Sequence, residues 1–546
     1  MLTTHQAFLN WSEKNPDREF LLQPVHGELN VITYKEAEDQ VRRMAAALSD
    51  IGLVPGDKVA ILGKNSAEWV LADLAIAMAG MISVPIYPTA NADTVSYVLG
   101  HSEASAVFVG KLDDPETVGK AIPQTLPSIA FPYPTAECQY QWQDLINNAE
   151  AIATPNEPQE EDVMTILYTS GSTGRPKGVV ISYRAFVYSC NATRNIIGFE
   201  EQGRTFSYLP LAHIVERGCV IGPSIFAGTR IYFNESLKTF QHDMKTARPT
   251  GFVSVPRLWV KFQSSVHSQI PPRKLRILLA IPIVGRLVAR KIRDNLGLKY
   301  CDVCSSGSAP ISPHTLQWYH KIGIHIGEGW GMSETSGLSC GNFPFQSNRL
   351  GTIGVPLEGT ELKISEKGEL LIRSPGLFTA YYKQPELTQE SFTDDGFFLT
   401  GDKANWDEKS KAYKITGRVK DIFKSAKGKY IAPLPIESRL SSNPLFEQVC
   451  VIGSGLPAPI AVVVLSDAAQ HLPKSSVEES FMATLVDTNA HLESHERISN
   501  FFIAKEEWTT ENGLLTPTLK VKRDEIEARY LSAISQGLSD KIAWEE

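Results

Sequence analysis

Short apolar runs alternate with amphipathic stretches through the first part of the chain. Residues 36–51 and 66–80 carry apolar side chains at helical spacing, whereas 58–62, 82–87 and 104–110 have the length and composition of buried strands. Further strands are predicted at 163–168, 230–233, 251–255, 300–304, 322–326 and 397–402. Strands that alternate with helices form parallel βαβ units, so the pattern predicts an α/β fold of layered sheets.

The most informative stretch is 163–178, where an apolar run breaks into hydroxyls and glycines and ends near a lysine. The polar residues that follow the predicted strand are Thr169, Ser170, Gly171, Ser172, Thr173, Gly174 and Lys177. Glycines let the backbone approach an anion closely, hydroxyls donate hydrogen bonds, and the lysine adds a point charge. This combination predicts a loop that holds a polyphosphate. The nucleotide loop of P-loop enzymes is excluded, because Lys177 lies between Pro176 and Gly178.

Three further polar clusters begin where predicted strands end. They are 305–310, 327–335 and 400–402. Ligands of open α/β sheets gather at the carboxyl ends of strands, so these clusters predict a nucleotide cleft. Within it, Trp330 can stack on a purine, Ser333 can bond a phosphate, Glu334 is a suitable magnesium ligand, and Asp402 can bind ribose hydroxyls.

The composition describes a globular protein with more than one domain. The chain has 546 residues, 42% of them hydrophobic and 21% charged, which exceeds one ordinary core and excludes a disordered chain. The net charge of −8 argues against broad nucleic-acid binding. After Arg418 the chain turns to lysines and prolines and then to a smaller set of strands and helices. We expect domains at 1–417 and 418–546.

The cysteines and the N-terminus predict a cytoplasmic location. The first residues lack a basic segment leading into an apolar core, and no apolar run is long enough to span a membrane. Seven scattered cysteines fit a reducing compartment. Cys301 and Cys304 form a Cys-x-x-Cys pair inside an apolar run, which favours buried strand cysteines over a metal or redox site.

A basic stretch at 257–299 stands out in this acidic chain. It contains ten lysines and arginines against one acidic residue, Asp294. A solvated helical face is the simpler interpretation. Peripheral contact with an anionic membrane, or attraction of an anionic ligand, stays open as the alternative.

In this order, the motifs resemble those of the adenylate-forming (AMP-binding) superfamily, and most closely those of long-chain fatty acyl-CoA synthetases. The superfamily motifs are 168–178, 329–335, 400–402 and 417–421. The segments similar to the long-chain branch are 209–217, 368–376 followed by Tyr381 and Tyr382, 423–433 and 515–523. The resemblance implies a large N-terminal domain of layered βαβ sheets and a small mobile C-terminal α+β domain.

The resemblance also implies roles for individual residues. Thr169 and Glu334 would hold Mg²⁺, Asp402 and Arg418 would bind ribose, and Lys177 with the residues 170–174 would hold the phosphates of ATP. The residues expected around the adenine are Gly307, Ser308, Ala309, Trp330, Gly331, Met332 and Ser333. Lys520 is the expected catalytic lysine of adenylate formation, with Lys522 as the competing assignment.

In the second step of this family, coenzyme A attacks the acyl-adenylate after the small domain rotates. The resemblance places the hinge at Lys420, brings the loop 424–430 with Lys424 and Gly428 to the site, and puts His213 beside the adenylate. The expected substrates are a fatty acid, ATP and coenzyme A, with Mg²⁺ as cofactor.

Several alternatives stay open in the sequence. An acyl-carrier protein can replace coenzyme A as acceptor, the acid need not be a fatty acid, and acyl chain length and oligomeric state are not specified. A serine hydrolase is a different class of enzyme, suggested by Gly-x-Ser-x-Gly at 337–341 with Ser339 as nucleophile. That motif lacks a preceding strand of its own and directly follows the predicted magnesium motif.

Overall fold

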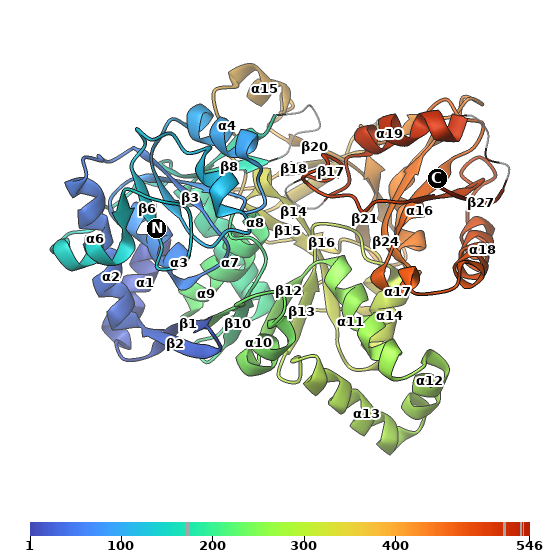
Figure 1. Cartoon of the computed structure of the whole chain (residues 1–546), viewed down its shortest axis with the longest axis horizontal. Coiled ribbons are helices and arrows are strands. Elements are labelled where there is room, and N and C mark those ends of the chain that lie inside the picture. The colour runs from blue at the N-terminus through green and yellow to red at the C-terminus, as the bar shows by residue number, and fades with distance from the viewer. Residues whose placement is uncertain (170–174, 517–519, 536–537, 539, 546) are drawn as a thin grey trace.

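The computed structural model describes residues 1–169, 175–516, 520–535, 538 and 540–545. Five residues of the predicted phosphate loop lie outside the described residues: Ser170, Gly171, Ser172, Thr173 and Gly174. Figure 1 shows a large N-terminal part, coloured blue to yellow, beside a smaller C-terminal part in orange and red. Both parts contain sheets covered by helices, so the predicted α/β class with a large and a small domain is confirmed.

An eight-stranded sheet forms the centre of the N-terminal part. Its order is β19-β9-β8-β4-β3-β5-β6-β7. The strands are β3 (Lys58–Leu62), β4 (Ile82–Ile86), β5 (Ala104–Val109), β6 (Ser128–Ala130), β7 (Tyr140–Gln141), β8 (Val163–Thr169), β9 (Lys177–Ser182) and β19 (Ala380–Tyr381). The six strands from β7 to β8 are parallel, whereas β9 and β19 add an antiparallel edge. The predicted phosphate loop connects the first antiparallel pair, β8 and β9.

Two helices stack on one another beside this sheet, close to their predicted positions. They are α2 (Tyr34–Asp50) and α3 (Ala67–Met78). Thr33 and Glu36 form a capping box that starts α2, and the Ser66 hydroxyl accepts a hydrogen bond from the Trp69 amide to start α3. α3 is apolar on nearly every side because it is buried between α2 and strands β3 and β4.

A second sheet of five strands carries two of the predicted polar clusters. Its strands are β12 (Gly251–Ser254), β13 (Val303–Ser306), β14 (Ile326–Met332), β15 (Gly337–Gly341) and β16 (Val355–Pro356). The predicted strands 300–304 and 322–326 were therefore placed too early, and residues 327–332 are strand, not loop. Glycines mislead here because a Cβ at Gly327 would lie 2.3 Å from the Phe343 ring, so the strand must lack side chains at that point.

A third sheet holds the predicted ribose carboxylate. Its strands are β17 (Glu361–Ile364), β18 (Glu369–Arg373), β20 (Phe398–Asp407) and β21 (Ala412–Arg418). The prediction that a strand ends at Asp402 was wrong, because β20 continues to Asp407. Gly401, at φ +72°, interrupts the extended backbone, and the pairing with β21 begins directly beyond it, at Asp402. A fourth sheet joins β10 (Arg204–Ser207), β11 (Arg230–Phe233), β1 (Glu19–Val25) and β2 (Glu28–Thr33).

The C-terminal part is an α+β unit around its own sheet. The sheet consists of β24 (Phe446–Ile452), β25 (Ile460–Leu465), β26 (Phe501–Ala504) and β27 (Ile542–Trp544), packed with α16 (Pro433–Leu440), α18 (Lys474–Ala490) and α19 (Arg523–Ser535). Its two clusters of buried side chains contain only residues from Phe423 onward. The domain boundary between residues 417 and 418 stays a prediction.

No helix among the described residues is both long and apolar enough to cross a membrane.

Candidate active site

Trp330, Asp402 and Arg418 form a hydrogen-bonded row that joins two sheets. The indole Nε1 of Trp330 donates to Asp402 Oδ2 over 2.9 Å, and Arg418 Nε lies 3.1 Å from Asp402 Oδ1. Asp402 and Arg418 face each other in the register of β20 and β21, which places the guanidinium beside the carboxylate. The buried carboxylate is thus oriented by two donors, one from each sheet.

Glu334 lies in the short helix η2 (Ser333–Thr335) that directly follows β14. Tyr381 donates from its hydroxyl to Glu334 Oε1 over 2.9 Å. Burial raises the pKa of Glu334, although this hydrogen bond and the positive charges of Arg418 and Lys177 act in the opposite direction. A buried carboxylate with a raised pKa has too little positive charge around it, which suits a site that receives a divalent cation.

Lys177 and Thr169 stand at the two ends of the predicted phosphate loop. They are paired in the antiparallel register of β8 and β9. Lys177 Nζ lies 5.2 Å from the centroid of the Tyr381 ring, so Tyr381 touches both Lys177 and Glu334. Burial lowers the pKa of Lys177, the charge of Lys420 lowers it further, and Glu334 raises it. Lys420, the predicted hinge residue, therefore lies close enough for its charge to act on Lys177.

The residues predicted around the adenine line the ends of β13 and β14. Gly307 follows β13, and a Cβ there would lie 3.3 Å from the Gly329 carbonyl oxygen. Ser308 has φ +67°, and Ala309 follows it. Gly331 has a packing reason for its lack of a side chain, because a Cβ would lie 1.7 Å from the Gly337 carbonyl oxygen. Met332 ends β14, where its amide donates to Thr335 Oγ1 over 3.1 Å, and Ser333 begins η2.

Lys520 reaches this cluster from the other end of the chain. Lys520 is exposed as a residue, but the protein partly desolvates its ammonium, and this lowers the pKa of Lys520. The charge of Arg418 lowers that pKa as well, whereas the charges of Asp402 and Glu334 raise it. The charges of three site residues, Arg418, Asp402 and Glu334, therefore act on it. The Lys522 amide donates to the Leu514 carbonyl. Lys520 therefore interacts electrostatically with Asp402 and Arg418 of the row described above.

His213 caps the short helix α8 (Ile214–Glu216) near the same lysine. Its Nδ1 accepts a hydrogen bond from the Val215 amide over 3.1 Å, so the proton of the neutral ring is on Nε2. Burial lowers the pKa of His213 to about 3, and the charge of Lys520 lowers it as well. His213 is therefore neutral at physiological pH.

Lys424 and Gly428 belong to the small hairpin of β22 (Phe423–Lys424) and β23 (Tyr430–Ile431). Lys424 pairs with Tyr430 in register, and its Nζ lies 5.7 Å from the centroid of that ring. Gly428 has φ +74°, which explains a glycine in the turn. Backbone hydrogen bonds link this hairpin to Gly455 and Leu456, and Phe423 and Ile431 pack in the buried cluster of the C-terminal part.

Sequence reasoning missed the role of Tyr381 and left a serine hydrolase open as an alternative. Tyr381 had no predicted role, although an aromatic hydroxyl in a buried strand is a signal for a hydrogen-bonded partner. Ser339 lies within strand β15, where its hydroxyl donates to the Gly337 carbonyl over 3.5 Å. A nucleophilic serine needs a sharp turn between a strand and a helix, so this position does not fit the hydrolase alternative.

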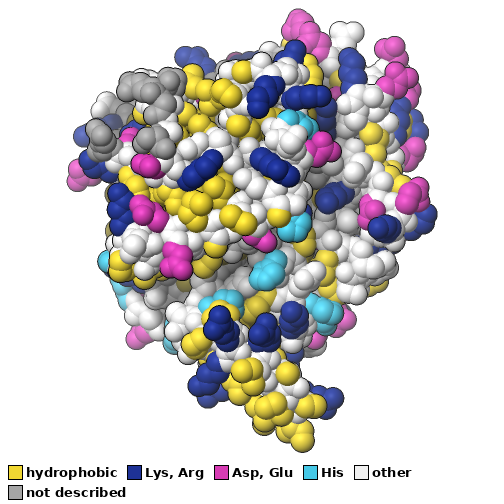
Figure 2. Space-filling model, turned by 90° about the vertical axis from the view of Figure 1, so that its right-hand side faces the viewer, with side chains coloured by type: hydrophobic (Ala, Val, Ile, Leu, Met, Phe, Trp, Pro, Cys, Tyr) yellow, Lys and Arg dark blue, Asp and Glu magenta, His cyan; other side chains and the backbone are white. Residues whose placement is uncertain are grey.

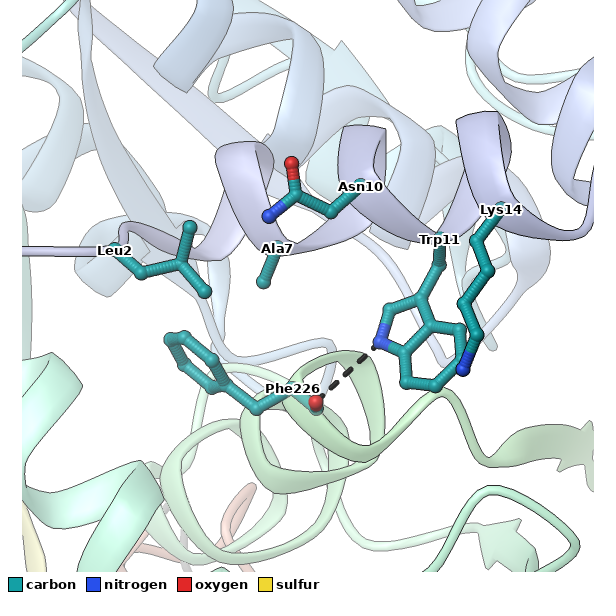
Figure 3. Close-up of a pocket in the computed structure, with 6 residues that line it drawn as sticks. All are labelled: Leu2, Ala7, Asn10, Trp11, Lys14 and Phe226. Carbon is teal, nitrogen blue, oxygen red and sulfur yellow. Dashed lines mark hydrogen bonds between the residues drawn. The ribbon is translucent and has the colours of Figure 1, made fainter.

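Two other candidate sites lie apart from this cluster. The Sγ atoms of Cys301 and Cys304 are 3.4 Å apart, a hydrogen-bonding distance, and form no disulfide. No cluster of three potential metal ligands occurs in the described parts of the chain. Figure 3 shows a pocket between α1 (Thr4–Lys14) and α9 (Gly222–Ala227). Its lining residues are Leu2, Ala7, Asn10, Trp11, Lys14 and Phe226, and none of them is a predicted site residue.

Solved structures with the same fold include adenylating enzymes. The adenylation domain of a carboxylate reductase from Mycobacterium chelonae superposes with a TM-score of 0.81 at 22% identity, covering 98% of this chain and 91% of that one. The anthranilate CoA ligase AuaEII in complex with anthranoyl-AMP gives a TM-score of 0.81 at 20% identity, covering 98% of both chains.

Sequence comparison gives relatives of nearly the same length. The long-chain-fatty-acid–CoA ligase FadD15 of Mycobacterium bovis is 30% identical over 95% of this chain and 94% of its own. Fatty acyl-CoA synthetase A of Dictyostelium discoideum is 30% identical over 95% of this chain and 87% of its own. The family model for AMP-binding enzymes matches residues 8–382, and the model for their C-terminal domain matches residues 420–540. Since the first model covers more than half of the chain and the second covers the part with Lys520, the protein belongs to the AMP-binding enzyme family.

Proposed function

We propose that the protein activates a fatty acid, of the long-chain class, with ATP to give an acyl-adenylate, and then transfers the acyl group to coenzyme A. The relatives named as fatty acyl-CoA ligases support the substrate class. The observation that carries the proposal is the row of Trp330, Asp402 and Arg418, a nucleotide-type site whose Asp402 and Arg418 charges also act on Lys520. The products are acyl-CoA, AMP and pyrophosphate.

The residues present fit ATP with Mg²⁺. Trp330 offers an indole held in place by Asp402, and that carboxylate with Arg418 offers partners for ribose hydroxyls. Glu334, buried and short of positive charge, and Thr169 would hold the metal. When bound, Mg²⁺ neutralises phosphate charge and polarises the phosphorus–oxygen bonds. Lys177 and the loop residues 170–174 would hold the phosphates that leave.

In the first half-reaction, a carboxylate oxygen of the fatty acid attacks the α-phosphorus of ATP. The bond from that phosphorus to the bridging oxygen breaks, and pyrophosphate leaves with the electron pair. Both reactants are anions, so the protein must supply positive charge where negative charge develops. Lys520 is suited to contact the acyl carboxylate and the α-phosphate together, and Lys177 is suited to stabilise the leaving pyrophosphate.

In the second half-reaction, the thiolate of coenzyme A attacks the acyl carbonyl carbon, and the bond to AMP breaks. Lys520 has no role in this step. We propose that the C-terminal domain turns about a hinge at Lys420, the position that the family resemblance indicates. The turn would withdraw Lys520 and bring Lys424 and Gly428 to the site. Neutral His213 adds no positive charge that would hold the adenylate in place.

A carrier protein is the alternative candidate for the acceptor of the acyl group. One solved relative by fold is an adenylation domain joined to a carrier domain, from a carboxylic acid reductase of Segniliparus rugosus, at 21% identity. The cationic segment with Lys424, Lys427 and Lys429 suits a phosphorylated nucleotide or an acidic carrier. Coenzyme A is the proposed acceptor because the names of the sequence relatives specify it.

The test compares Lys520→Ala with Lys522→Ala in separate assays of the two half-reactions. We expect Lys520→Ala to lower pyrophosphate release at least ~100-fold while thioester formation from supplied acyl-adenylate persists. Lys522→Ala is the matched control and should retain both. The proposal fails for Lys520 if Lys522→Ala alone shows the loss, and it fails for the acyl-CoA activity if no fatty acid of any length yields acyl-CoA with the wild-type protein.

A further inference from the structure

Two short helices form a hairpin that projects from the N-terminal part. They are α12 (Pro272–Ala280) and α13 (Pro282–Asn295), joined at Ile281, and they lie at the lower right of Figure 1. The helices approach closely at Gly285, where a Cβ would lie 2.6 Å from the Leu279 carbonyl oxygen. Leu275, Ala289 and Ile292 are buried and anchor the hairpin on the core. The projection is therefore a folded part of the protein.

The outer face of this hairpin is apolar and exposed. Ile277, Ile283 and Leu287 expose 63%, 75% and 62% of their surface. With Ile281 and Val284, they are five of the eighteen large apolar side chains that the described part of the chain exposes, and they fall within eleven consecutive residues. A cluster of this kind on a soluble surface marks a place that contacts another apolar phase or partner.

Cations flank these apolar side chains. Between residues 272 and 293 the chain has seven lysines and arginines and no acidic residue, although its net charge is −8. Six of the seven are exposed and form no ion pair or hydrogen bond with a described residue: Arg273, Lys274, Arg276, Arg286, Arg290 and Lys291. Figure 2 shows the projection at the bottom of the molecule, with an apolar tip below a group of cations.

The spacing places both kinds of side chain on one surface of α13. Ile283 and Leu287 are four residues apart and share a face, on the side opposite the buried Ala289 and Ile292. Arg286 and Arg290, also four apart, border that face. Two other cations of the predicted basic stretch are already neutralised, because Arg257 pairs with Glu447 and Lys299 pairs with Asp294.

We infer that the hairpin α12–α13 docks the enzyme on the surface of an anionic phospholipid bilayer. Exposed isoleucines and a leucine would enter the boundary between headgroups and acyl chains, while the flanking cations would contact lipid phosphates. A nucleic acid offers no apolar phase to these side chains, and an acidic protein is the competing occupant. The hairpin contains no residue of the candidate active site, and the inference does not depend on the proposed acyl-CoA activity.

The experiment is flotation of the full-length protein with vesicles of phosphatidylcholine alone or mixed with phosphatidylglycerol. We expect binding to the anionic vesicles that weakens with added salt, and little binding to neutral ones. Arg286→Glu/Arg290→Glu should lower the bound fraction at least ~10-fold. The matched control, Lys35→Glu/Lys120→Glu, makes the same charge change on exposed lysines elsewhere and should bind like the wild type.

A second pair of variants tests the apolar contribution without changing charge. Ile283→Asn/Leu287→Asn should weaken vesicle binding, whereas Leu29→Asn/Leu237→Asn, which alters exposed leucines elsewhere, should not. All four variants should keep the wild-type melting temperature and the wild-type rate of pyrophosphate release in vesicle-free solution. No binding to either kind of vesicle would overturn the inference and favour an acidic protein as the occupant. Equal binding to neutral and anionic vesicles would overturn the preference for anionic lipid.

Discussion

The hydroxyl of Tyr381 donates a hydrogen bond to Glu334 over 2.9 Å, although the two residues are 47 positions apart in the chain. The link arises because β19, which carries Tyr381, pairs with β9, and the Phe378 amide donates to the Glu334 carbonyl over 2.8 Å. One tyrosine therefore connects the proposed metal ligand to Lys177 at the end of the phosphate loop. The edge strand β19 therefore helps to position Glu334.

Replacing Tyr381 with phenylalanine tests this link. The hydrogen bond lowers the pKa of Glu334, so its loss raises that pKa. The carboxylate of the variant then stays protonated up to a higher pH than in the wild type. We expect the acidic limb of the pH–rate profile to move to higher pH and the Mg²⁺ concentration at half-maximal rate to rise about tenfold. Tyr382→Phe is the control, since Tyr382 donates to the exposed Glu103. A profile that shifts equally in both variants would contradict the link.

Trp330→Phe tests the row that joins the indole to Asp402. The variant keeps an aromatic ring but loses the donor to Asp402, so the ring and the carboxylate become less well oriented. We expect the KM for ATP to rise at least ~10-fold, the cost of one hydrogen bond to a charged group, with little change in the KM for the fatty acid.

Trp544→Phe is the matched control for that substitution. Trp544 also donates from Nε1 to a carboxylate, that of Glu478, in the C-terminal part. Its loss should leave the KM for ATP unchanged. A rise in KM for the fatty acid alone in Trp330→Phe would assign the indole to the acyl site instead.

Much of the fold follows from local patterns in the sequence. The strands at 58–62 and 230–233 were predicted to the residue, because each is an apolar run bounded by polar or turn residues. β14 was misjudged because its glycines are required by the ring of Phe343 and by the neighbouring strand, and neither requirement is visible locally. Asp402 was placed at a strand end for a similar reason, since Gly401 marks a bend within a longer strand.

The partners of site residues depend on tertiary structure. The motif residues Trp330, Asp402 and Arg418 were predicted separately, but their mutual contacts depend on how two sheets meet. The choice between Lys520 and Lys522 was open in the sequence, because the two lysines are nearly adjacent. The assignment of Lys520 stays a prediction, supported by its electrostatic influence on His213, and no local pattern encodes that influence.

Lys420→Pro tests the proposed hinge. Proline fixes φ and should prevent the backbone rotation that a turn of the C-terminal domain requires. We expect pyrophosphate release from ATP and fatty acid to continue, while thioester formation from supplied acyl-adenylate falls at least ~10-fold. Lys420→Ala is the control, because it removes the ammonium without restricting the backbone. Equal loss of both half-reactions in the proline variant would refute a hinge that separates them.

Arg217 is a buried cation whose partners hold together the sheet behind the site. Only 2% of its side chain is exposed, and its guanidinium contacts both carboxylate oxygens of Asp73, at 2.5 and 3.1 Å. It also donates to the hydroxyls of Thr165 and Ser83, each over 2.6 Å. These contacts tie α3 to β4 and β8, and β8 leads into the phosphate loop. The ion pair therefore supports β8, the strand that ends at Thr169.

We expect Arg217→Met to destabilise the protein by about 3–5 kcal/mol, since it leaves the Asp73 carboxylate without its counter-charge. The double variant Arg217→Met/Asp73→Leu removes both charges and should recover a large part of that loss. Chemical denaturation followed by tryptophan fluorescence measures both. Arg373→Met, which breaks an exposed pair with Glu361, is the control and should scarcely move the midpoint. If the double variant is no more stable than Arg217→Met, the buried hydroxyl contacts and not the ion pair determine the stability of this region.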